Sequence, residues 1–161
     1  MAYKIFISHS IADRQWVGQI DVIAKNSGIA AYLYEHDSQP GKYIAEKVKQ
    51  AIQNSDALVV LLTYNSQFSP YVQQEIGFAE ARGMRIIPLV QPGIPERSLA
   101  MLEGREYIPF DFYNPQGALL KLLNYLQQQL RLKKAKENEQ TILMLIIVGL
   151  FILALMFGGK K

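Results

Sequence analysis

The stretch from residue 57 to residue 63, ALVVLLT, limits the fold of this chain more than any other part of the sequence. It is an unbroken apolar run of strand length. Strands of this kind are typical of parallel sheets whose two faces are both covered by helices. A helix is expected soon after it, because Ser69 is a good N-cap and Pro70 suits the first helical position. Strand, loop and helix in this order form the repeating unit of an α/β fold.

The same alternation runs through most of the 161 residues. We expect strands at residues 4–8, 29–34, 57–63, 85–90 and 107–110. Helical spacing of apolar residues predicts helices from 13 to a stop at Gly28, from 44 to a stop at Asn54, from 70 to a stop at Gly83, and from about 116 onward. Alternating β and α elements indicate a doubly wound parallel sheet.

Residues 141–157 carry no charge and consist almost wholly of large apolar side chains. As a helix this segment is about 26 Å long, or about 28 Å with Gly158 and Gly159. This length is close to the roughly 30 Å of a bilayer core. A hydrophobic core helix is the alternative, but such a helix has a polar face where it meets water, and this run has none. We therefore expect a transmembrane helix at residues 141–159.

Positively charged residues between Arg131 and Lys136 precede the expected span. Such residues favour the cytoplasmic side of a membrane, so a globular domain at residues 1–133 is expected in the cytoplasm. Residues 134–140 are expected to form a juxtamembrane linker that continues the last helix of the domain. The sequence thus predicts a single-pass protein held at a membrane by a C-terminal anchor.

Composition argues against several classes of function. The chain has no cysteine, so disulfides and thiolate chemistry are excluded. The formal net charge is only +3 and no basic run is interleaved with aromatic residues, so nucleic acid is not an expected partner. The two histidines, His9 and His36, do not have the spacing of a metal site, and no metal is expected. The glycine-rich loops that bind dinucleotides or nucleoside triphosphates are absent from the sequence.

The helix expected after residue 69 has two distinct faces. One is a core face with Val72, Ile76 and Ala79, and the other contains Tyr71, Glu75, Phe78 and Arg82. In an open α/β sheet, ligands bind in the crevice at the carboxyl ends of the strands, where this helix begins. Glu75 is therefore a candidate catalytic carboxylate. The alternative is a solvated glutamate favoured by the positive end of the helix dipole.

Several segments together resemble successive motifs of the TIR domain. They are Lys4-Ile5-Phe6-Ile7-Ser8-His9-Ser10, the loop that ends in Pro40-Gly41-Lys42, the strand Ser55-Asp56-Ala57-Leu58-Val59-Val60-Leu61-Leu62, and Ser69-x-Tyr71-Val72-x-x-Glu75 with Ile76 and Ala79. The resemblance covers residue 1 to about residue 133, and the motifs occur in the right order at the right separations. The chain looks most like prokaryotic antiviral-defence TIR proteins of the Thoeris type, and like the NAD-cleaving TIR domain of the axon-degeneration factor.

This resemblance implies a flavodoxin-like sheet of five parallel strands and an enzyme that cleaves NAD+. Glu75 aligns with the catalytic glutamate of the enzymatic members. NAD+ is implied to lie between Glu75, the end of the first strand and the loop before Gly41. Tyr71 stands where the family usually has tryptophan, and His9 and Ser10 stand where some relatives have tyrosine and arginine. NAD+ is the implied substrate, and no cofactor is implied.

The candidate substrate-binding residues follow from this resemblance and from the chemistry of the side chains. Aromatic side chains can hold the nicotinamide or adenine ring, although ordinary packing is their commoner role. Lys42 can meet a phosphate, or it can be a solvated loop lysine. The candidates are Ser8, His9, Ser10, Tyr34, Gly41, Lys42, Tyr71 and Phe78, with Tyr43 as a further aromatic candidate.

A single carboxylate is sufficient for the implied reaction. Most glycosidases need a second carboxylic acid to protonate a poor leaving group. Nicotinamide leaves NAD+ as a neutral molecule, so one carboxylate can hold the ribose hydroxyls and stabilise the oxocarbenium-like ribosyl centre. Attack by water then gives ADP-ribose, and attack by a second nucleophile of the same molecule gives a cyclic ADP-ribose isomer.

The resemblance and the apolar tail together predict a membrane-anchored TIR NAD+ glycohydrolase or cyclase, that is, an NAD+ nucleosidase. Its expected setting is antiviral defence signalling, with activation by self-association and a downstream effector that senses the nucleotide product. One alternative is a non-enzymatic adaptor, in which the loop at residues 35–41 and neighbouring surfaces mediate contacts between TIR domains at the membrane. The other is a nucleoside deoxyribosyltransferase-like enzyme, which would also place a glutamate beside a ribose.

Overall fold

The computed structural model describes residues 2–34 and 44–157. Among the residues singled out from the sequence, Gly41, Lys42 and Tyr43 lie outside the described residues, as do Gly158 and Gly159. The loop at residues 35–41, which the adaptor hypothesis uses, also lies outside them.

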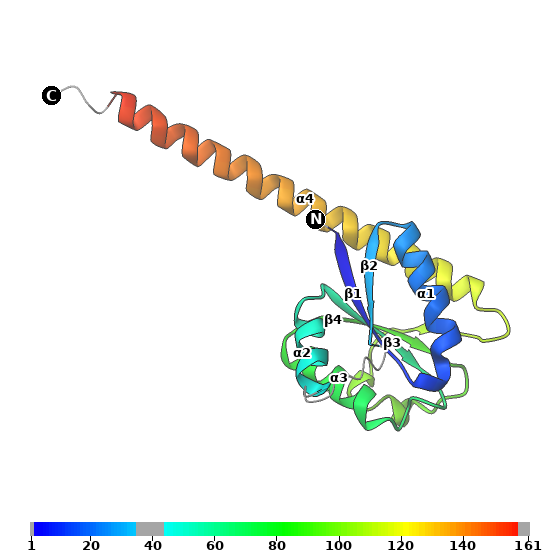
Figure 1. The fold of residues 1–161 in the computed structure, drawn as a ribbon. Coiled ribbons are helices and arrows are strands. Elements are labelled where there is room, and N and C mark those ends of the chain that lie inside the picture. Colours follow the sequence, from blue (N-terminus) through cyan, green and yellow to red (C-terminus); the bar gives the residue numbers. More distant parts are fainter. Residues whose placement is uncertain (1, 35–43, 158–161) are drawn as a thin grey trace.

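A five-stranded parallel sheet forms the centre of the domain (Figure 1). In chain order the strands are β1 (Tyr3–Ser8), β2 (Ile29–Leu33), β3 (Ala57–Leu62), β4 (Arg85–Val90) and β5 (Ile108–Pro109). They lie side by side in the order β2-β1-β3-β4-β5, and each neighbouring pair is parallel. This is the strand order of flavodoxin-like, doubly wound sheets, so the predicted fold class is confirmed.

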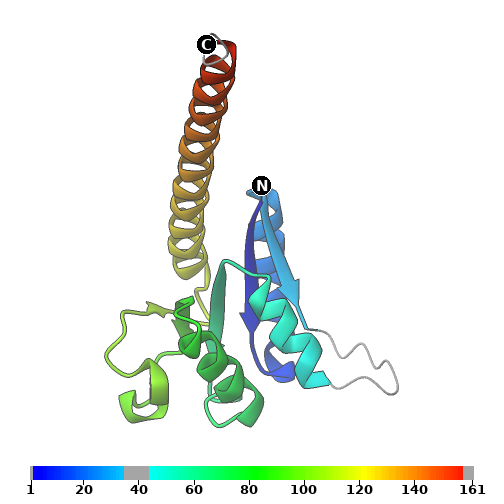
Figure 2. The same cartoon turned by 90° about the vertical axis from the view of Figure 1, so that its left-hand side faces the viewer.

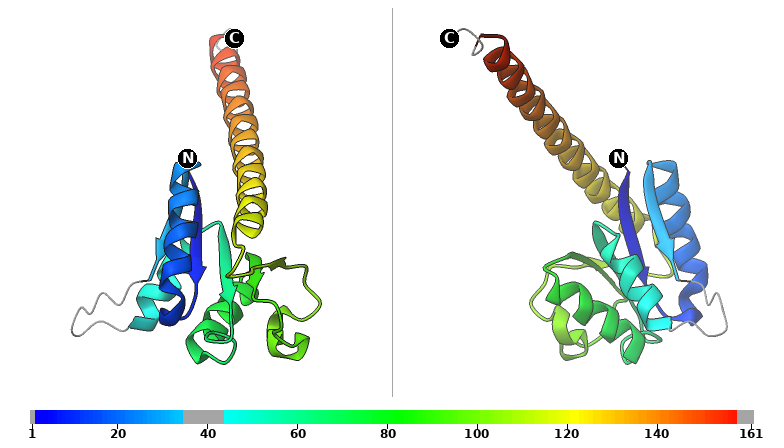
Figure 3. Two further views of the ribbon diagram at one scale, coloured as in Figure 1. Left: turned by 90° about the vertical axis from the view of Figure 1, so that its right-hand side faces the viewer. Right: turned by 60° about the vertical axis from the view of Figure 1, so that its left-hand side comes forward.

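Helices cover both faces of the sheet. The helical elements are η1 (Ile11–Asp13), α1 (Arg14–Asn26), α2 (Ile44–Gln53), α3 (Pro70–Ala81), η2 (Glu96–Leu102) and α4 (Gln116–Phe157), of which η1 and η2 are 3-10 helices. The helices α2 and α3 pack on one face (Figure 2). The helix α1 and the first part of α4 pack on the other (Figure 3, left).

The central strand β3 is buried on both sides, as its sequence predicts. Its six side chains are all 0% exposed. Odd-numbered residues such as Val59 pack on the side of α1 and α4, and even-numbered residues such as Val60 pack on the side of α2 and α3. Successive side chains of a strand point to opposite faces, so a strand between two helical layers needs apolar residues at every position.

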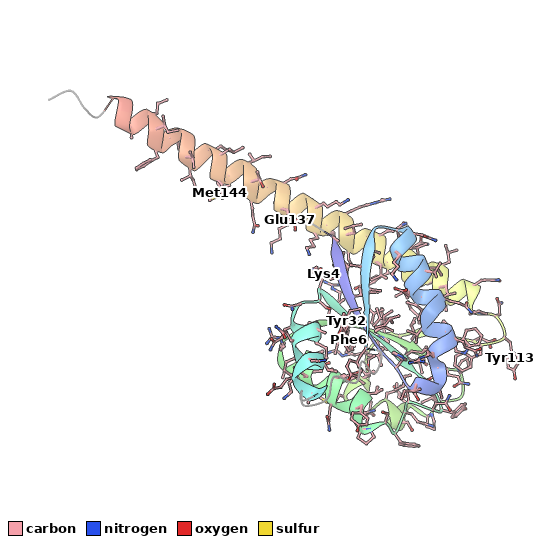
Figure 4. The ribbon with its side chains drawn as sticks, viewed as in Figure 1. Lys4, Phe6, Tyr32, Tyr113, Glu137 and Met144 are labelled. Atoms are coloured by element: carbon pink, nitrogen blue, oxygen red, sulfur yellow. The ribbon has the colours of Figure 1, made fainter. Side chains whose placement is uncertain are left out.

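The strand β1 shows the same alternation but ends in a polar residue. Ile5 and Ile7 pack on the side of α1 and α4, whereas Phe6 packs on the side of α2 and α3. There Phe6 stacks on Tyr32, with the ring centroids 5.8 Å apart (Figure 4). Ser8 is two residues after Phe6 and so points to the same face. The end of β1 therefore presents a hydroxyl to α2 and α3.

The helix α3 begins and ends where its sequence predicts. Ser69 Oγ accepts a hydrogen bond from the Val72 N–H, and Pro70 is the first helical residue. Gly83 follows the helix with a φ of +62°, a left-handed conformation that glycine adopts without strain. The core face predicted from the spacing is buried. Because this face packs on the sheet, the neighbouring face that contains Glu75 is turned toward α2 and the end of β1.

The helix α4 is continuous and extends well beyond the domain (Figure 1). Its first half packs on the sheet through a stripe of leucines, and residues 134–140 continue the helix without a break. In the second half, side chains such as Met144 surround the helix with no part of the domain beside them (Figure 4). The large apolar side chains between residues 142 and 153 are 50–67% exposed. Within the described residues, α4 alone has the length and apolar composition needed to cross a membrane.

A charged cluster holds α4 against the amino ends of the strands. Lys133 Nζ donates to the two carboxylate oxygens of Asp56 at 2.9 and 2.8 Å, and to the Ala2 carbonyl oxygen at 3.2 Å. Asp56 also accepts the Lys4 N–H at 2.7 Å. Asp56, the residue before β3, thus connects α4 to the start of β1. The helix leaves the domain at the amino edge of the sheet, opposite the edge where β1 ends at Ser8.

Candidate active site

Glu75 and Ser8 meet at the carboxyl end of β1. Ser8 is the last residue of that strand and is only 1% exposed. Its hydroxyl donates a hydrogen bond to Glu75 Oε2. Glu75 lies in the second turn of α3, on the face next to the core stripe. The alternation of β1 and the helical period of α3 together bring these two distant positions into contact.

The carboxyl group of Glu75 lies in an environment that disfavours its charge. Burial raises the pKa of Glu75 from 4.5 to about 7, and the hydrogen bond from Ser8 opposes part of this rise. A solvated glutamate at the start of a helix does not fit this burial. At neutral pH the carboxylate and the carboxylic acid are therefore present in comparable amounts.

A buried polar network fixes the loop that leads from β3 into α3. Thr63 Oγ1 donates to Asp13 Oδ2 at 2.7 Å, and Asn65 Nδ2 donates to Asp13 Oδ1 at 2.8 Å. Ser66 Oγ accepts the Thr63 N–H at 2.7 Å and donates to the Leu61 carbonyl oxygen at 2.8 Å. Both carboxylate oxygens of the buried Asp13 are thus satisfied. The network thus holds the loop before α3 against η1 and the end of β3.

A cavity of about 430 Å³ opens beside Glu75, between α2, α3 and the end of β1. This volume lies within the range of roughly 300–1,000 Å³ that is usual for small-molecule sites. The sequence candidates that line it are Glu75, His9, Ser10, Tyr34, Tyr71 and Phe78. Ser8 takes part in the site through the hydrogen bond that it donates to Glu75. Gly41 and Lys42 belong to the part of the chain that the structure does not describe.

His9 and Ser10 continue the cavity wall from the end of β1, and both are half-buried. His9 Nδ1 donates to the Ile7 carbonyl oxygen at 3.0 Å, since a carbonyl oxygen only accepts. In the neutral ring this leaves Nε2 as an acceptor. Ser10 Oγ accepts the Ala12 N–H at 3.3 Å and caps η1. Both side chains are therefore oriented by bonds to nearby backbone.

The α2 side of the cavity was missed by reasoning from the sequence. Lys49 lines the cavity together with the apolar residues Ala45, Val48 and Ile52. Their spacing places all four on one face of α2, so helical periodicity carried a signal for this wall. A lysine on a helix is usually solvated, so the residue type of Lys49 gives no signal of a site. Ile7 and Ser69, which belong to the motifs quoted from the sequence, also line the cavity, as do Ile11 and Gln74, which no motif marked.

Among the described residues that line the cavity, Glu75 is the one carboxylate. A buried carboxylate can stabilise positive charge that develops on a sugar carbon and can accept hydrogen bonds from sugar hydroxyls. With a pKa near neutrality it can also give or take a proton. A lone carboxylate differs from the pair of carboxyl groups used by most O-glycosidases. The arrangement fits cleavage of a bond between a sugar and a good nitrogen leaving group.

A family model described as TIR domain matches residues 5–123, which is most of the chain. This chain belongs to the TIR domain family. The matched segment contains Ser8, Glu75 and every described residue that lines the cavity. A search of curated proteins finds no match to the chain.

Solved structures share the TIR fold with this chain at low sequence identity. The TIR domains of the activated Roq1 resistosome, which recognizes the pathogen effector XopQ, have a TM-score of 0.62 at 14% identity, covering 78% of this chain and 99% of that chain. The TIR domain of the Toll-related receptor TRR-2 from Hydra magnipapillata has a TM-score of 0.61 at 20% identity. The match covers 79% of this chain and 99% of that chain. The CMP N-glycosidase BcmB from Clostridium botulinum has a TM-score of 0.57 at 19% identity. The match covers 76% of this chain and 98% of that chain. At such identities the likeness concerns the fold of the TIR domain.

Proposed function

We propose that this TIR protein is an NAD+ glycohydrolase or cyclase that breaks the bond between nicotinamide and ribose. The observation that carries the proposal is the carboxyl group of Glu75, which is half-buried, hydrogen-bonded to Ser8 and open to a cavity of ligand size. Burying a carboxylate without a cation destabilises a fold. A strongly shifted pKa in a cavity is therefore typical of a functional group rather than a structural one.

In this reaction Glu75 acts as a carboxylate beside the ribose. The bond between C1′ of the ribose and N1 of nicotinamide breaks, and its electron pair leaves with nicotinamide, which becomes neutral. The carboxylate stabilises the positive charge that develops on the ribosyl group. Water then adds to C1′ and releases a proton, which gives ADP-ribose. Attack by another nucleophilic atom of the same molecule gives a cyclic ADP-ribose isomer.

The remaining candidates supply the walls around the reacting ribose. Tyr71 stands at the mouth of the cavity and is 73% exposed, whereas Tyr34 and Phe78 are half-buried in its wall. Flat aromatic faces suit the nicotinamide and adenine rings. His9 and Ser10 line the wall that follows β1. Ser8 orients the carboxyl group of Glu75 through its hydrogen bond.

We also propose that residues 141–159 anchor the protein in a membrane, with the TIR domain in the cytoplasm. The large apolar side chains at residues 142–153 are exposed around α4, and apolar surface in water costs about 25 cal/mol per Å². A bilayer removes that cost. The positive residues at 131–136 lie on the domain side of the span, as expected for a cytoplasmic domain. Residues 134–140 then form the helical juxtamembrane linker.

The proposed setting is antiviral defence signalling of the Thoeris type, as the sequence resemblance implies. Activation by self-association fits an anchored domain, because confinement to a surface raises the effective concentration. Among proteins with this fold, the Roq1 TIR domains occur within an assembled resistosome. In this proposal the nucleotide product acts on a downstream effector.

A nucleotide N-glycosidase is the second candidate. It is favoured by the fold shared with the CMP N-glycosidase of Clostridium botulinum and by the pKa of Glu75, about 7. A pyrimidine base is a poorer leaving group than nicotinamide and needs a proton, which a partly protonated carboxyl group can supply. The deoxyribosyltransferase-like enzyme considered from the sequence belongs to the same chemical class.

A comparison of substrates separates these functions. The full-length protein in liposomes is incubated with NAD+, with CMP, and with a deoxyribonucleoside plus an acceptor base, and the products are identified by mass spectrometry. Release of nicotinamide supports the NAD+ reaction. Release of cytosine or transfer of deoxyribose instead supports the second candidate. Protein that leaves all substrates intact but still self-associates on the liposomes contradicts both enzymes and supports the adaptor.

A further inference from the structure

Two cations flank the aromatic ring at one end of the cavity. Lys49 Nζ lies 5.9 Å from the ring centroid of Phe78, and the guanidinium carbon of Arg82 lies 5.6 Å from it. The quadrupole of an aromatic ring attracts a cation at this distance, which accounts for each contact taken alone. Both cations therefore lie beside the same ring.

No carboxylate among residues 2–34 and 44–157 pairs with these two cations. Among the described residues, neither Lys49 nor Arg82 forms an ion pair. The pKa of Glu75 is set by burial and by the hydrogen bond from Ser8, so neither cation compensates that carboxyl group. Lys49 lines the cavity, whereas Arg82 lies beside it through its contact with Phe78. This end of the cavity therefore presents positive charge to a ligand.

The helical period of α3 places Glu75 between the two ends of the cavity. At 1.5 Å per residue, Tyr71 lies about 6 Å from Glu75 toward the start of the helix, and Phe78 lies about 4.5 Å toward its end. Tyr71 is at the carboxyl edge of the sheet, where His9 also lines the cavity. Phe78 lies in the groove between α2 and α3. The middle of a ligand that fills the cavity thus lies beside Glu75.

We propose that a substrate of the reaction proposed above lies with its phosphate toward Lys49 and Arg82 and its nicotinamide ring toward Tyr71. The bound nicotinamide carries a positive charge, so the two cations repel it. A phosphate is negative and forms charge-assisted hydrogen bonds with lysine and arginine. The opposite orientation would bring three positive charges together. Lys49 and Arg82 are thus assigned to the 5′-phosphate that nicotinamide mononucleotide and NAD+ share.

The test compares three compounds that differ in phosphate content. Cleavage of nicotinamide riboside, nicotinamide mononucleotide and NAD+ is measured for the full-length protein in detergent micelles at fixed ionic strength. The variants are Lys49→Gln and Arg82→Gln, whose cations lie over the Phe78 ring. Lys47→Gln is the control, because Lys47 is on α2 but has neither that ring contact nor a place in the cavity lining. We expect each of the first two to raise KM for both phosphate-bearing compounds about tenfold, because a charged hydrogen bond is lost. KM for the riboside should change by less than about twofold, and Lys47→Gln should have the KM values of the wild type.

Failure of this orientation and failure of the proposed function give different results. Equal losses for all three compounds, or no loss for any, would overturn the orientation while cleavage itself still stood. If the wild type cleaves none of them, the proposed function fails, and binding of nicotinamide mononucleotide is measured by ligand-detected NMR. Weaker binding to Lys49→Gln than to the wild type would still support a phosphate site. Equal binding, or no binding to either protein, would overturn it.

Discussion

Glu75 holds a carboxyl group where ionisation is opposed by the surrounding protein. Burial raises its pKa to about 7, and the hydroxyl of Ser8 donates a hydrogen bond that favours the charged form. An apolar residue at this position would avoid the cost of burying a charge. The pair is therefore better explained by a reaction that needs a carboxylate than by stability.

This environment leads to a pH dependence with a definite sign. We expect kcat/KM for NAD+ to rise with pH and to level off above about pH 7, because the carboxylate is the active form and the free enzyme loses its Glu75 proton through the pKa of about 7. Ser8→Ala removes the hydrogen bond that lowers this pKa, so the rise should move to higher pH. Ser55→Ala removes a hydroxyl bonded to the Ala51 carbonyl at the end of α2 and should leave the profile in place. Initial rates between pH 5 and pH 9 test this; a rate that falls through pH 7 would show that Glu75 acts as an acid.

At the scale of secondary-structure elements, α3 positions Glu75, and the start of this helix depends on the Ser69 cap. The Val72 N–H donates to Ser69 Oγ, so Ser69→Ala leaves that donor without its acceptor. We expect the free energy of unfolding to fall by about 1 kcal/mol, whereas Ser69→Asp, which keeps an acceptor, should stay close to the wild type. Urea unfolding followed by circular dichroism measures the difference. Equal stability of all three proteins would contradict the capping role.

Elements with local signals were predictable from the sequence. The run in β3 indicated a doubly covered sheet, Ser69 and Pro70 marked the start of α3, and Gly28 and Gly83 marked the ends of α1 and α3. Each of these signals depends on residues within a few positions of one another. The parallel, doubly wound sheet followed from the alternation of elements, and its flavodoxin-like arrangement followed from the family resemblance.

Contacts between distant elements were not predictable in the same way. The hydrogen bond from Ser8 to Glu75 joins positions 67 residues apart, and no local pattern indicates it. Lys49 comes to the cavity through the packing of α2 against α3. The short helix η2 was not predicted at all, because it is stabilised by burying Leu99 and Leu102 in the core rather than by a periodic pattern of its own. Tertiary packing determined all three features.

At the scale of the whole molecule, the site and the proposed anchor lie at opposite ends of the sheet. Lys133 and Asp56 hold α4 at the amino edge, whereas Ser8 and Glu75 meet at the carboxyl edge. In Figure 1 and in the right-hand view of Figure 3, α4 extends away from the domain past the start of β1. The cavity of an anchored protein would therefore open away from the lipid surface, toward soluble substrate.

Removal of the apolar half of α4 should release the protein from membranes. We expect the full-length chain to float with liposomes in a density gradient, because its exposed apolar side chains enter the bilayer. A chain that ends at residue 140 keeps the buried leucines of α4 and the Lys133–Asp56 ion pair, and it should stay with the soluble fraction. A full-length chain that remains soluble as an oligomer would show that α4 packs against other copies instead.

The central claim is that the carboxyl group of Glu75 is required to cleave the bond between nicotinamide and ribose. Its most direct test is the rate of nicotinamide release from NAD+ by the full-length protein, by Glu75→Gln and by Glu80→Gln. Glu80 is on the same helix but pairs with Arg105 outside the cavity, so its loss is a matched control. We predict that Glu75→Gln lowers kcat at least about 100-fold, as for loss of a main electrostatic group, and that Glu80→Gln stays near the wild type. Nicotinamide release by Glu75→Gln at the wild-type rate would contradict the claim.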